Sequence, residues 1–152
     1  MNNVKDRVKN NIDATKHTRK KNLLTALDKA FDELNTSTDW TAVKPQEASY
    51  SCCSSCIFGS PQFDDRENAV TYNDQDLAGF RTSQRENKDT AYWYGRESHS
   101  GEFIYLQHRG TSHKNYKELI QVLNNHGIYV AWDWNKEIKL RVFLAKYKGA
   151  LL

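Results

Sequence analysis

The spacing of apolar residues predicts a helical region at the start of the chain. Between residues 23 and 35 the apolar side chains recur every three or four positions and form one stripe: Leu23, Leu24, Leu27, Ala30, Phe31 and Leu34. From Val4 to Ile12 only about one apolar residue falls in each turn. The stretch from Val4 to Asn35 is therefore predicted to be helical, and its earlier part to form a shorter helix or an arm that breaks near residues 13–18.

A second amphipathic helix and two alternating strands are predicted in the last third of the chain. Thr111 or Ser112 caps this helix, and Gly127 is a suitable C-terminal stop. The apolar stripe of the helix consists of Tyr116, Leu119, Ile120 and Leu123. Segments 128–134 and 138–144 then predict a hairpin with a tight turn at 135–136, in which Trp132 and Trp134 both face the core.

Shorter apolar segments in the middle of the chain predict further strands. Residues 48–53, 69–72, 91–94 and 102–107 have strand character, and residues 73–76 offer a turn or helix cap before 77–80. Residues 40–47, 54–66 and 82–90 are polar or contain Pro or Gly, which indicates connections. The predicted fold class is α+β: a mixed or antiparallel sheet packed by an N-terminal helix and a C-terminal helix followed by a β-hairpin. Residues 1–152 are expected to form one domain, with residues 1–21 as a basic helical arm.

Composition supports an ordered domain and limits its setting. Hydrophobic residues make up 38% of the chain, and 8 Tyr, 6 Phe and 4 Trp supply large apolar surfaces. No apolar run approaches the roughly 20 residues that span a bilayer. The polar N-terminus lacks the apolar stretch of a signal peptide, so we expect a cytoplasmic protein with no membrane contact. The net charge of +3 is too small to indicate nucleic-acid binding by itself.

The clearest candidate for chemistry is a short cysteine segment with Cys52, Cys53 and Cys56. In a reducing compartment, three cysteines favour metal ligands or free thiols over a disulfide framework. Zinc takes four ligands, and the candidates for a fourth are His99, His108, His113 and His126. Against a metal site, a second CxxC is missing, and adjacent cysteines in an extended segment point in opposite directions.

Two other interpretations of these cysteines stand beside the metal site. A redox role requires the first cysteine as an exposed thiolate, usually at a helix N-terminus, and residues 57–61 make a poor helix start. Free cysteines also pack well as small buried residues, and this interpretation is favoured. The sequence therefore predicts no cofactor, with zinc as the alternative.

Three other groups of residues are candidate binding sites. Asp74 and Asp76 could hold a cation, although a helix cap beside a solvated loop is favoured. The exposed form of an aromatic segment would bind a partner through Tyr92, Trp93 and Tyr94. The residues of the basic segment that could contact nucleic-acid phosphates are Lys16, Arg19, Lys20 and Lys21. For that segment, a solvated helix face is favoured.

Three segments together resemble an uncharacterised bacterial family, a domain of unknown function. Its members show Cys-Cys-x-x-Cys, then Tyr-x-x-Gln-Asp after a strand, then a Gly-Ile-x-Val-x-Trp-Asp strand. Residues 52–56 match the first segment, 72–76 the second in part, and 127–133 the third. Ile57 and Asn73 stand where the family often has Gly and His. The resemblance covers roughly the last two thirds of the chain and implies one fold, with no activity to transfer.

The pattern contains no assembled catalytic set, such as a phosphate loop or a nucleophile elbow. The leading hypothesis is a small non-enzymatic protein that acts through a protein partner, for example a phage or mobile-element inhibitor of a host system. One alternative is a metal-binding or thiol-based enzyme centred on the cysteines. The other is nucleic-acid binding through the basic N-terminal segment.

Overall fold

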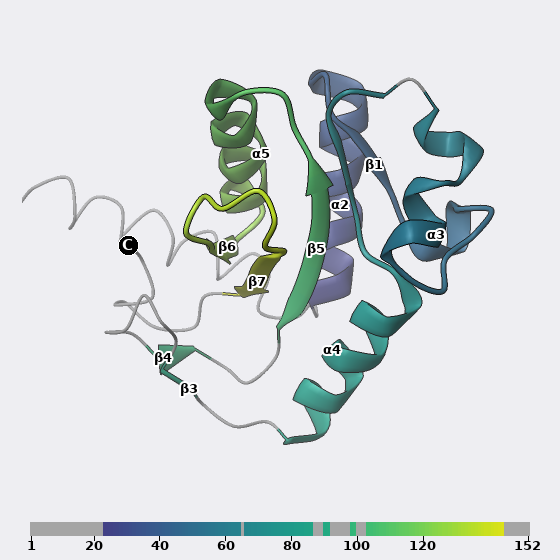
Figure 1. The fold of residues 1–152 in the computed structure, drawn as a ribbon. Coiled ribbons are helices and arrows are strands. Elements are labelled where there is room, and N and C mark those ends of the chain that lie inside the picture. The colour runs from purple at the N-terminus through teal and green to yellow at the C-terminus, as the bar shows by residue number, and fades with distance from the viewer. Residues whose placement is uncertain (1–22, 65, 87–89, 92–97, 100–102, 145–152) are drawn as a thin grey trace, which may run out of the picture.

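The fold is built on a five-stranded mixed sheet with helices on both faces (Figure 1). The computed structural model describes residues 23–64, 66–86, 90–91, 98–99 and 103–144. The strand order is β1-β2-β5-β7-β6. Their bounds are β1 Thr41–Val43, β2 Ala69–Thr71, β5 Ile104–Arg109, β6 Ile128–Ala131 and β7 Leu140–Leu144. The β1–β2 pair is parallel and the other neighbours are antiparallel, so the predicted α+β class with a mixed sheet is confirmed.

One face of the sheet is covered by α2 (Leu23–Ser37) and α5 (His113–Asn125), which also pack against each other. Side chains alternate along a strand, so Val70, Leu106 and Val142 all point to this face. They join the main core together with the apolar stripes of the two helices, including Leu27 and Leu119. The amphipathic patterns were sufficient to predict both helices because each stripe has one large apolar surface to cover.

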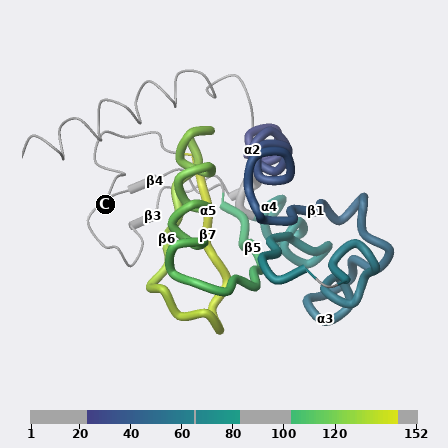
Figure 2. Tube along the Cα trace, turned by 90° about the horizontal axis from the view of Figure 1, so that it is seen from above, coloured from purple at the N-terminus to yellow at the C-terminus, as the bar shows by residue number. Residues whose placement is uncertain are grey.

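The opposite face carries the shorter elements. These are the 3-10 helices η1 (Pro45–Glu47) and η2 (Pro61–Phe63) and the short helix α3 (Ser54–Phe58). The longer helix α4 (Asp74–Glu86) lies against β5, and its Leu77 and Phe80 join the main core. A second, smaller apolar cluster fills the space beneath α3 and η2, and it consists of Val43, Ile57, Phe63 and Ala69. Figure 2 shows that α3 lies at one end of the molecule, far from β6 and β7.

Several segments differ from the prediction. Residues 48–53 form no strand and lead instead into α3, while β1 lies in the segment 40–47 that was expected to be a connection. Helix α4 extends to Glu86, across residues expected to be a connection. Residues 1–22 and 92–97 lie outside the described part, and with them the basic arm and the Tyr92-Trp93-Tyr94 segment. A two-stranded ribbon joins β3 (Thr90–Ala91) to β4 (Ser98–His99). None of the described helices has the length and apolar character needed to cross a membrane.

The β6–β7 hairpin is confirmed, but the tight turn at 135–136 is wrong. The strands end at Ala131 and resume at Leu140, so an eight-residue loop joins them. Trp132 is buried with 2% exposure, whereas Trp134 is 41% exposed and stacks on the ring of His113. Trp134 lies in this loop, beyond the end of β6, and adopts a positive φ of 69°, so the alternation of a strand does not apply to its side chain.

Candidate functional site

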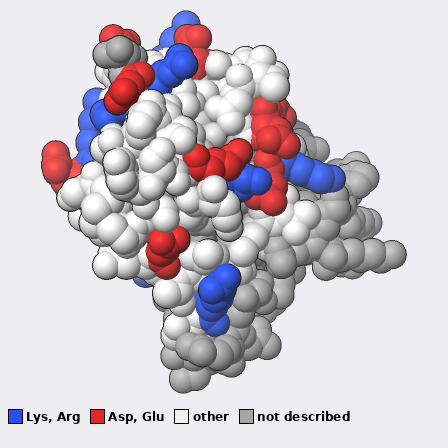
Figure 3. All heavy atoms as spheres, turned by 90° about the vertical axis from the view of Figure 1, so that its right-hand side faces the viewer, with Lys and Arg blue, Asp and Glu red and all other residues white. Residues whose placement is uncertain are grey.

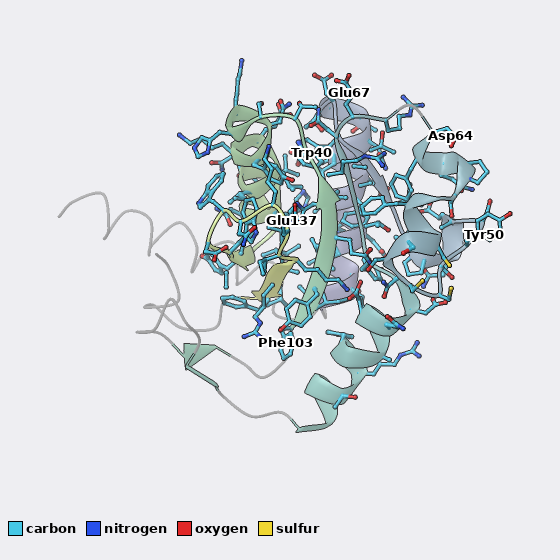
Figure 4. All side chains as sticks on the ribbon, viewed as in Figure 1. Trp40, Tyr50, Asp64, Glu67, Phe103 and Glu137 are labelled. Carbon is cyan, nitrogen blue, oxygen red and sulfur yellow. The ribbon has the colours of Figure 1, made fainter. Side chains whose placement is uncertain are left out.

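Three cysteine side chains converge at the surface where α3 begins. The sulfur atoms of Cys52, Cys53 and Cys56 all lie within 4.8 Å of one another, and 3.8 Å separates Cys52 Sγ from Cys53 Sγ. We call these three residues the thiol cluster. In Figure 4 the yellow sulfur atoms gather at the outer edge of the molecule, near the labelled ring of Tyr50. The fold therefore brings together all three cysteines that the sequence singled out.

The prediction that Cys52 and Cys53 point in opposite directions is wrong because the chain is not a continuous strand there. It bends at both residues, and Cys53 is the N-cap of α3. The backbone N–H of Ile57 donates to the Cys53 carbonyl at 3.0 Å, which closes the first helical turn. Cys56 therefore lies one turn further along the same side of the helix as Cys53.

The segments on both sides of the thiol cluster are held in place. The Ser60 hydroxyl accepts from the Tyr50 backbone N–H and donates to its carbonyl, both at 2.9 Å, so it ties the chain before the cluster to the chain after it. The Ser51 carbonyl accepts from the backbone N–H of Asp74 at 2.8 Å. Beneath α3, Ile57 is fully buried in the smaller apolar cluster. The sulfurs are thus positioned by the protein before any ligand binds.

Exposure of the thiol cluster contradicts the favoured interpretation of buried cysteines. Cys52 is exposed, and Cys53 and Cys56 are half-exposed. The expected obstacle to a redox role is also absent, because the helix begins at Ser54, upstream of the poor start at 57–61, and directly follows Cys53. The sulfurs are open to ions and small reagents from solution.

The three thiols influence one another's ionisation. The backbone N–H of Cys56 contributes most to lowering the pKa of the Cys53 thiol, and the Cys56 and Cys52 thiols add to the effect. The Cys53 side chain nevertheless makes no cap hydrogen bond to α3. The pKa of Cys56 is raised to about 12, first by its side-chain hydrogen bonding with Cys52 and then by that with Cys53. The Cys53 thiol therefore loses its proton at a lower pH than an isolated cysteine does, and the Cys56 thiol at a higher pH.

No histidine or carboxylate among the described residues joins the thiol cluster as a ligand group. Three of the predicted candidates are engaged elsewhere. His108 contacts the Tyr116 hydroxyl, His113 stacks on Trp134, and His126 pairs with Glu33 at 3.0 Å. The side chain of His99 lies outside the described part. A metal ion at the cluster would complete its coordination from solution.

The two carboxylates proposed as a cation site have different surroundings and different hydrogen-bond partners. Asp76 is buried and accepts from three donors: the Asn73 backbone N–H at 2.9 Å, Gln107 Nε2 at 2.8 Å and Lys139 Nζ at 2.8 Å. Asn73 Oδ1 accepts in return from the Asp76 backbone N–H at 2.8 Å, so the predicted helix cap is present. Asp74 is exposed and accepts from the Ser51 hydroxyl at 2.8 Å. Three of the about four acceptor positions of Asp76 are therefore taken by protein donors, one of which is the cationic Lys139.

An aromatic cluster packs where α5 meets β5 and the β6–β7 loop. Tyr116 lies at its centre, with ring centroids 5.4 Å from Trp40, 5.2 Å from His108 and 4.8 Å from Trp132. The Ile138 carbonyl can only accept, so His108 Nε2 carries a proton and, in the neutral ring, Nδ1 accepts from the Tyr116 hydroxyl. Burial lowers the pKa of His108 and favours this neutral form. The cluster is a core feature with one exposed member, Trp134.

Among the described residues, the surface around α3 shows no concentration of basic side chains. Figure 3 faces this end of the molecule, and much of it is free of charged groups, with acidic and basic residues scattered around a broad uncharged area. The basic segment proposed for nucleic acid lies outside the described residues, so that hypothesis stays a prediction. Charge on this face favours no polyanion.

Comparisons with known proteins leave the thiol cluster as the main guide to function. No protein-family model matches the chain, and neither a curated protein nor a solved structure matches it. The resemblance to the bacterial family with a Cys-Cys-x-x-Cys segment therefore stays a prediction.

Proposed function

We propose that this protein binds a soft metal ion, Zn²⁺ or Cu⁺, through the thiolates of Cys52, Cys53 and Cys56. The observation that carries the proposal is the convergence of the three sulfur atoms within 4.8 Å at an exposed position. Thiolate sulfur is a soft ligand and prefers these ions to Mg²⁺ or Ca²⁺, which require oxygen ligands. The oxygen-free ligand set therefore supports one class of ion.

The distances suit such an ion with little movement. With Zn–S bonds of about 2.3 Å, neighbouring sulfurs lie about 3.8 Å apart in a tetrahedron and about 4.0 Å apart in a trigonal plane. Cys52 Sγ and Cys53 Sγ are already 3.8 Å apart, and no pair exceeds 4.8 Å. The widest pair therefore needs to close by at most about 1 Å, which side-chain rotation can supply.

Exposure supports an exchangeable ion over a structural one. Structural zinc sites are closed by four protein ligands and contribute the folding energy of small domains. Here the main core of α2, α5 and the sheet forms without the thiol cluster, which lies on a five-residue helix at one end of the molecule. Three protein ligands leave a coordination position open to solvent or to a thiol from another molecule. The proposed role is thus reversible metal binding, as in carriage or sensing of the ion.

Metal titration of the reduced protein tests the proposal. Zn²⁺ is titrated in competition with a chromophoric chelator, Cu⁺ in the same way under anaerobic conditions, and Co²⁺ as a spectroscopic probe of sulfur ligation. One ion per chain is expected, with sulfur-to-metal charge-transfer absorption for Co²⁺. Each of Cys52→Ser, Cys53→Ser and Cys56→Ser should weaken binding more than about tenfold, or about 1.4 kcal/mol. The control Ser55→Ala changes an exposed residue of the same helix and should bind as the unaltered chain does.

Two outcomes contradict the proposal. Undetectable binding of both Zn²⁺ and Cu⁺ by the fully reduced protein removes it. Binding that all three serine variants retain at full strength moves the ion elsewhere on the chain.

The expectation of a protein partner has one observation in its favour. The β6–β7 loop exposes Trp134 by 41% and Ile138 by 49%, and exposed aromatic residues are frequent at the centres of interfaces. A partner bound there should be lost with Trp134→Ala and retained with the three cysteine variants. Co-purification of a partner that is unaffected by Trp134→Ala contradicts the role of this loop as the binding surface. The further expectation of a phage or mobile-element inhibitor stays a prediction.

A further inference from the structure

The thiol cluster offers three possible disulfide pairs, and the backbone disfavours one of them and suits another. A disulfide joins cysteines whose Cα atoms are about 4.4–6.8 Å apart. Cys52 and Cys53 are neighbours across a trans peptide, since none of the described peptide bonds is cis, and their Cα atoms are therefore about 3.8 Å apart. Their sulfurs are close, but the backbone is too short for an unstrained bond between them.

Cys53 and Cys56 have the spacing that a disulfide requires. They begin and end a three-residue step of α3, and the Ile57 N–H to Cys53 carbonyl bond at 3.0 Å holds this turn. Three residues of an α-helix rise about 4.5 Å, which with a radius of about 2.3 Å places the two Cα atoms about 5 Å apart. Both side chains are half-exposed and their sulfurs lie within 4.8 Å. Cys52 precedes the cap and is not part of this turn.

We infer that Cys53 and Cys56 are a reversible redox pair, which hydrogen peroxide oxidises to a disulfide, and that this bond expels the metal ion from the thiol cluster. The second half of the inference rests on the proposed metal binding, and the first half does not. The disulfide withdraws two of the three sulfur ligands. Cys52 alone retains no chelate, so the ion leaves as a solvated cation.

The reaction balances with peroxide as the only oxidant. The thiolate of one cysteine attacks a peroxide oxygen, the O–O bond breaks, and a sulfenic acid and hydroxide result. The sulfur of the second cysteine then attacks the sulfenic sulfur, so the S–S bond forms as the S–O bond breaks. The departing hydroxide takes a proton and leaves as water. Two thiols lose two electrons and two protons in all, and one peroxide becomes two water molecules. A dithiol reductant reverses the change by thiol–disulfide exchange.

Differential labelling of the three cysteines tests the pairing. The reduced full-length chain is treated with one equivalent of hydrogen peroxide, free thiols are alkylated, the disulfide is reduced, and the released thiols receive a second label. Fragmentation mass spectrometry then locates each label. We expect the first label on Cys52 and the second on Cys53 and Cys56. Cys52→Ser should still form the bond, whereas Cys53→Ser and Cys56→Ser should lose it.

Release of the ion is measured in the same sample with a zinc indicator after loading with Zn²⁺. One Zn²⁺ is expected for each disulfide formed, and the dithiol reductant should restore binding. The inference is overturned if the disulfide requires Cys52, or if the unaltered chain forms no disulfide. Zn²⁺ that stays bound to the oxidised cluster also overturns it. If the Cys53–Cys56 bond forms but the reduced chain binds no metal, the redox pair stands and the proposed function fails.

Discussion

The buried carboxylate of Asp76 permits a quantitative test of how α4 is fastened to the sheet. Its side chain is 4% exposed and receives hydrogen bonds from Asn73, Gln107 and Lys139, which belong to three different parts of the chain. Asp76→Ala leaves the Asn73 N–H and Gln107 Nε2 buried without this acceptor, at about 1–3 kcal/mol each. The Lys139 ammonium, on a side chain that is 36% exposed, can turn to water. We expect the free energy of unfolding to fall by about 2–6 kcal/mol, the sum for the two donors that lose their acceptor.

Urea unfolding followed by tryptophan fluorescence measures this change at equilibrium. Lys139→Met and the double variant complete a thermodynamic cycle, and a coupling of about 1–3 kcal/mol is expected for groups in direct contact. The matched control is Asp74→Ala, which removes an exposed carboxylate two residues away. It should cost less than about 1 kcal/mol. The reasoning is refuted if Asp76→Ala costs no more than this control, because Asp76 would then behave as an exposed helix cap.

Three further predictions follow from other parts of the fold. A Cβ at Gly110 would lie 2.7 Å from Tyr116 Cε2, so Gly110→Ala should destabilise the protein by about 1–3 kcal/mol. A Cβ at Gly79 on α4 would meet open space, so Gly79→Ala should stabilise the protein by about 0.5–1 kcal/mol. Thermal unfolding of both variants checks the contrast. Burial lowers the pKa of His108 from 6.5, so the folded protein takes up this proton less readily than the unfolded chain. The free energy of unfolding should therefore fall as pH drops below about 6.5, and His108→Gln should reduce that fall in urea titrations at pH 7 and pH 5; an unchanged pH dependence contradicts it. Serine at all three positions of the thiol cluster should change the free energy of unfolding by no more than about 0.5 kcal/mol per position, measured by urea unfolding. Global unfolding of that variant would instead indicate a structural site.

Local patterns were sufficient where one surface decided the structure. The stripe from Leu23 to Leu34 and the alternation of Leu140, Val142 and Leu144 each have a single apolar face, and the structure buries each of them. The polar segment 73–76 predicted a turn or helix cap, and the structure has a cap at Asn73. These features depend on neighbours in sequence, which is why they could be predicted without the fold.

The errors fall where distant contacts outweigh local preference. Residues 41–43 form a strand because β2 pairs with them, although the segment lacks a strand pattern of its own. Trp134 lies in the loop beyond the end of β6 at a positive φ, and its ring stacks on that of His113. A periodic pattern carries no information about either partner.

The sequence by itself determined the α+β class, the helices α2 and α5 and the hairpin, and it singled out the three cysteines as a candidate site. Only the tertiary structure decided what those cysteines can do. Their sulfurs converge because the chain bends at Cys52, α3 begins after Cys53, and Ser60 ties the returning chain to Tyr50. These contacts reach up to ten residues along the chain and rest on a small apolar cluster drawn from β1, α3, η2 and β2. Residue order sets which thiols are present, whereas packing sets the distances between them, and metal binding and disulfide formation depend on those distances.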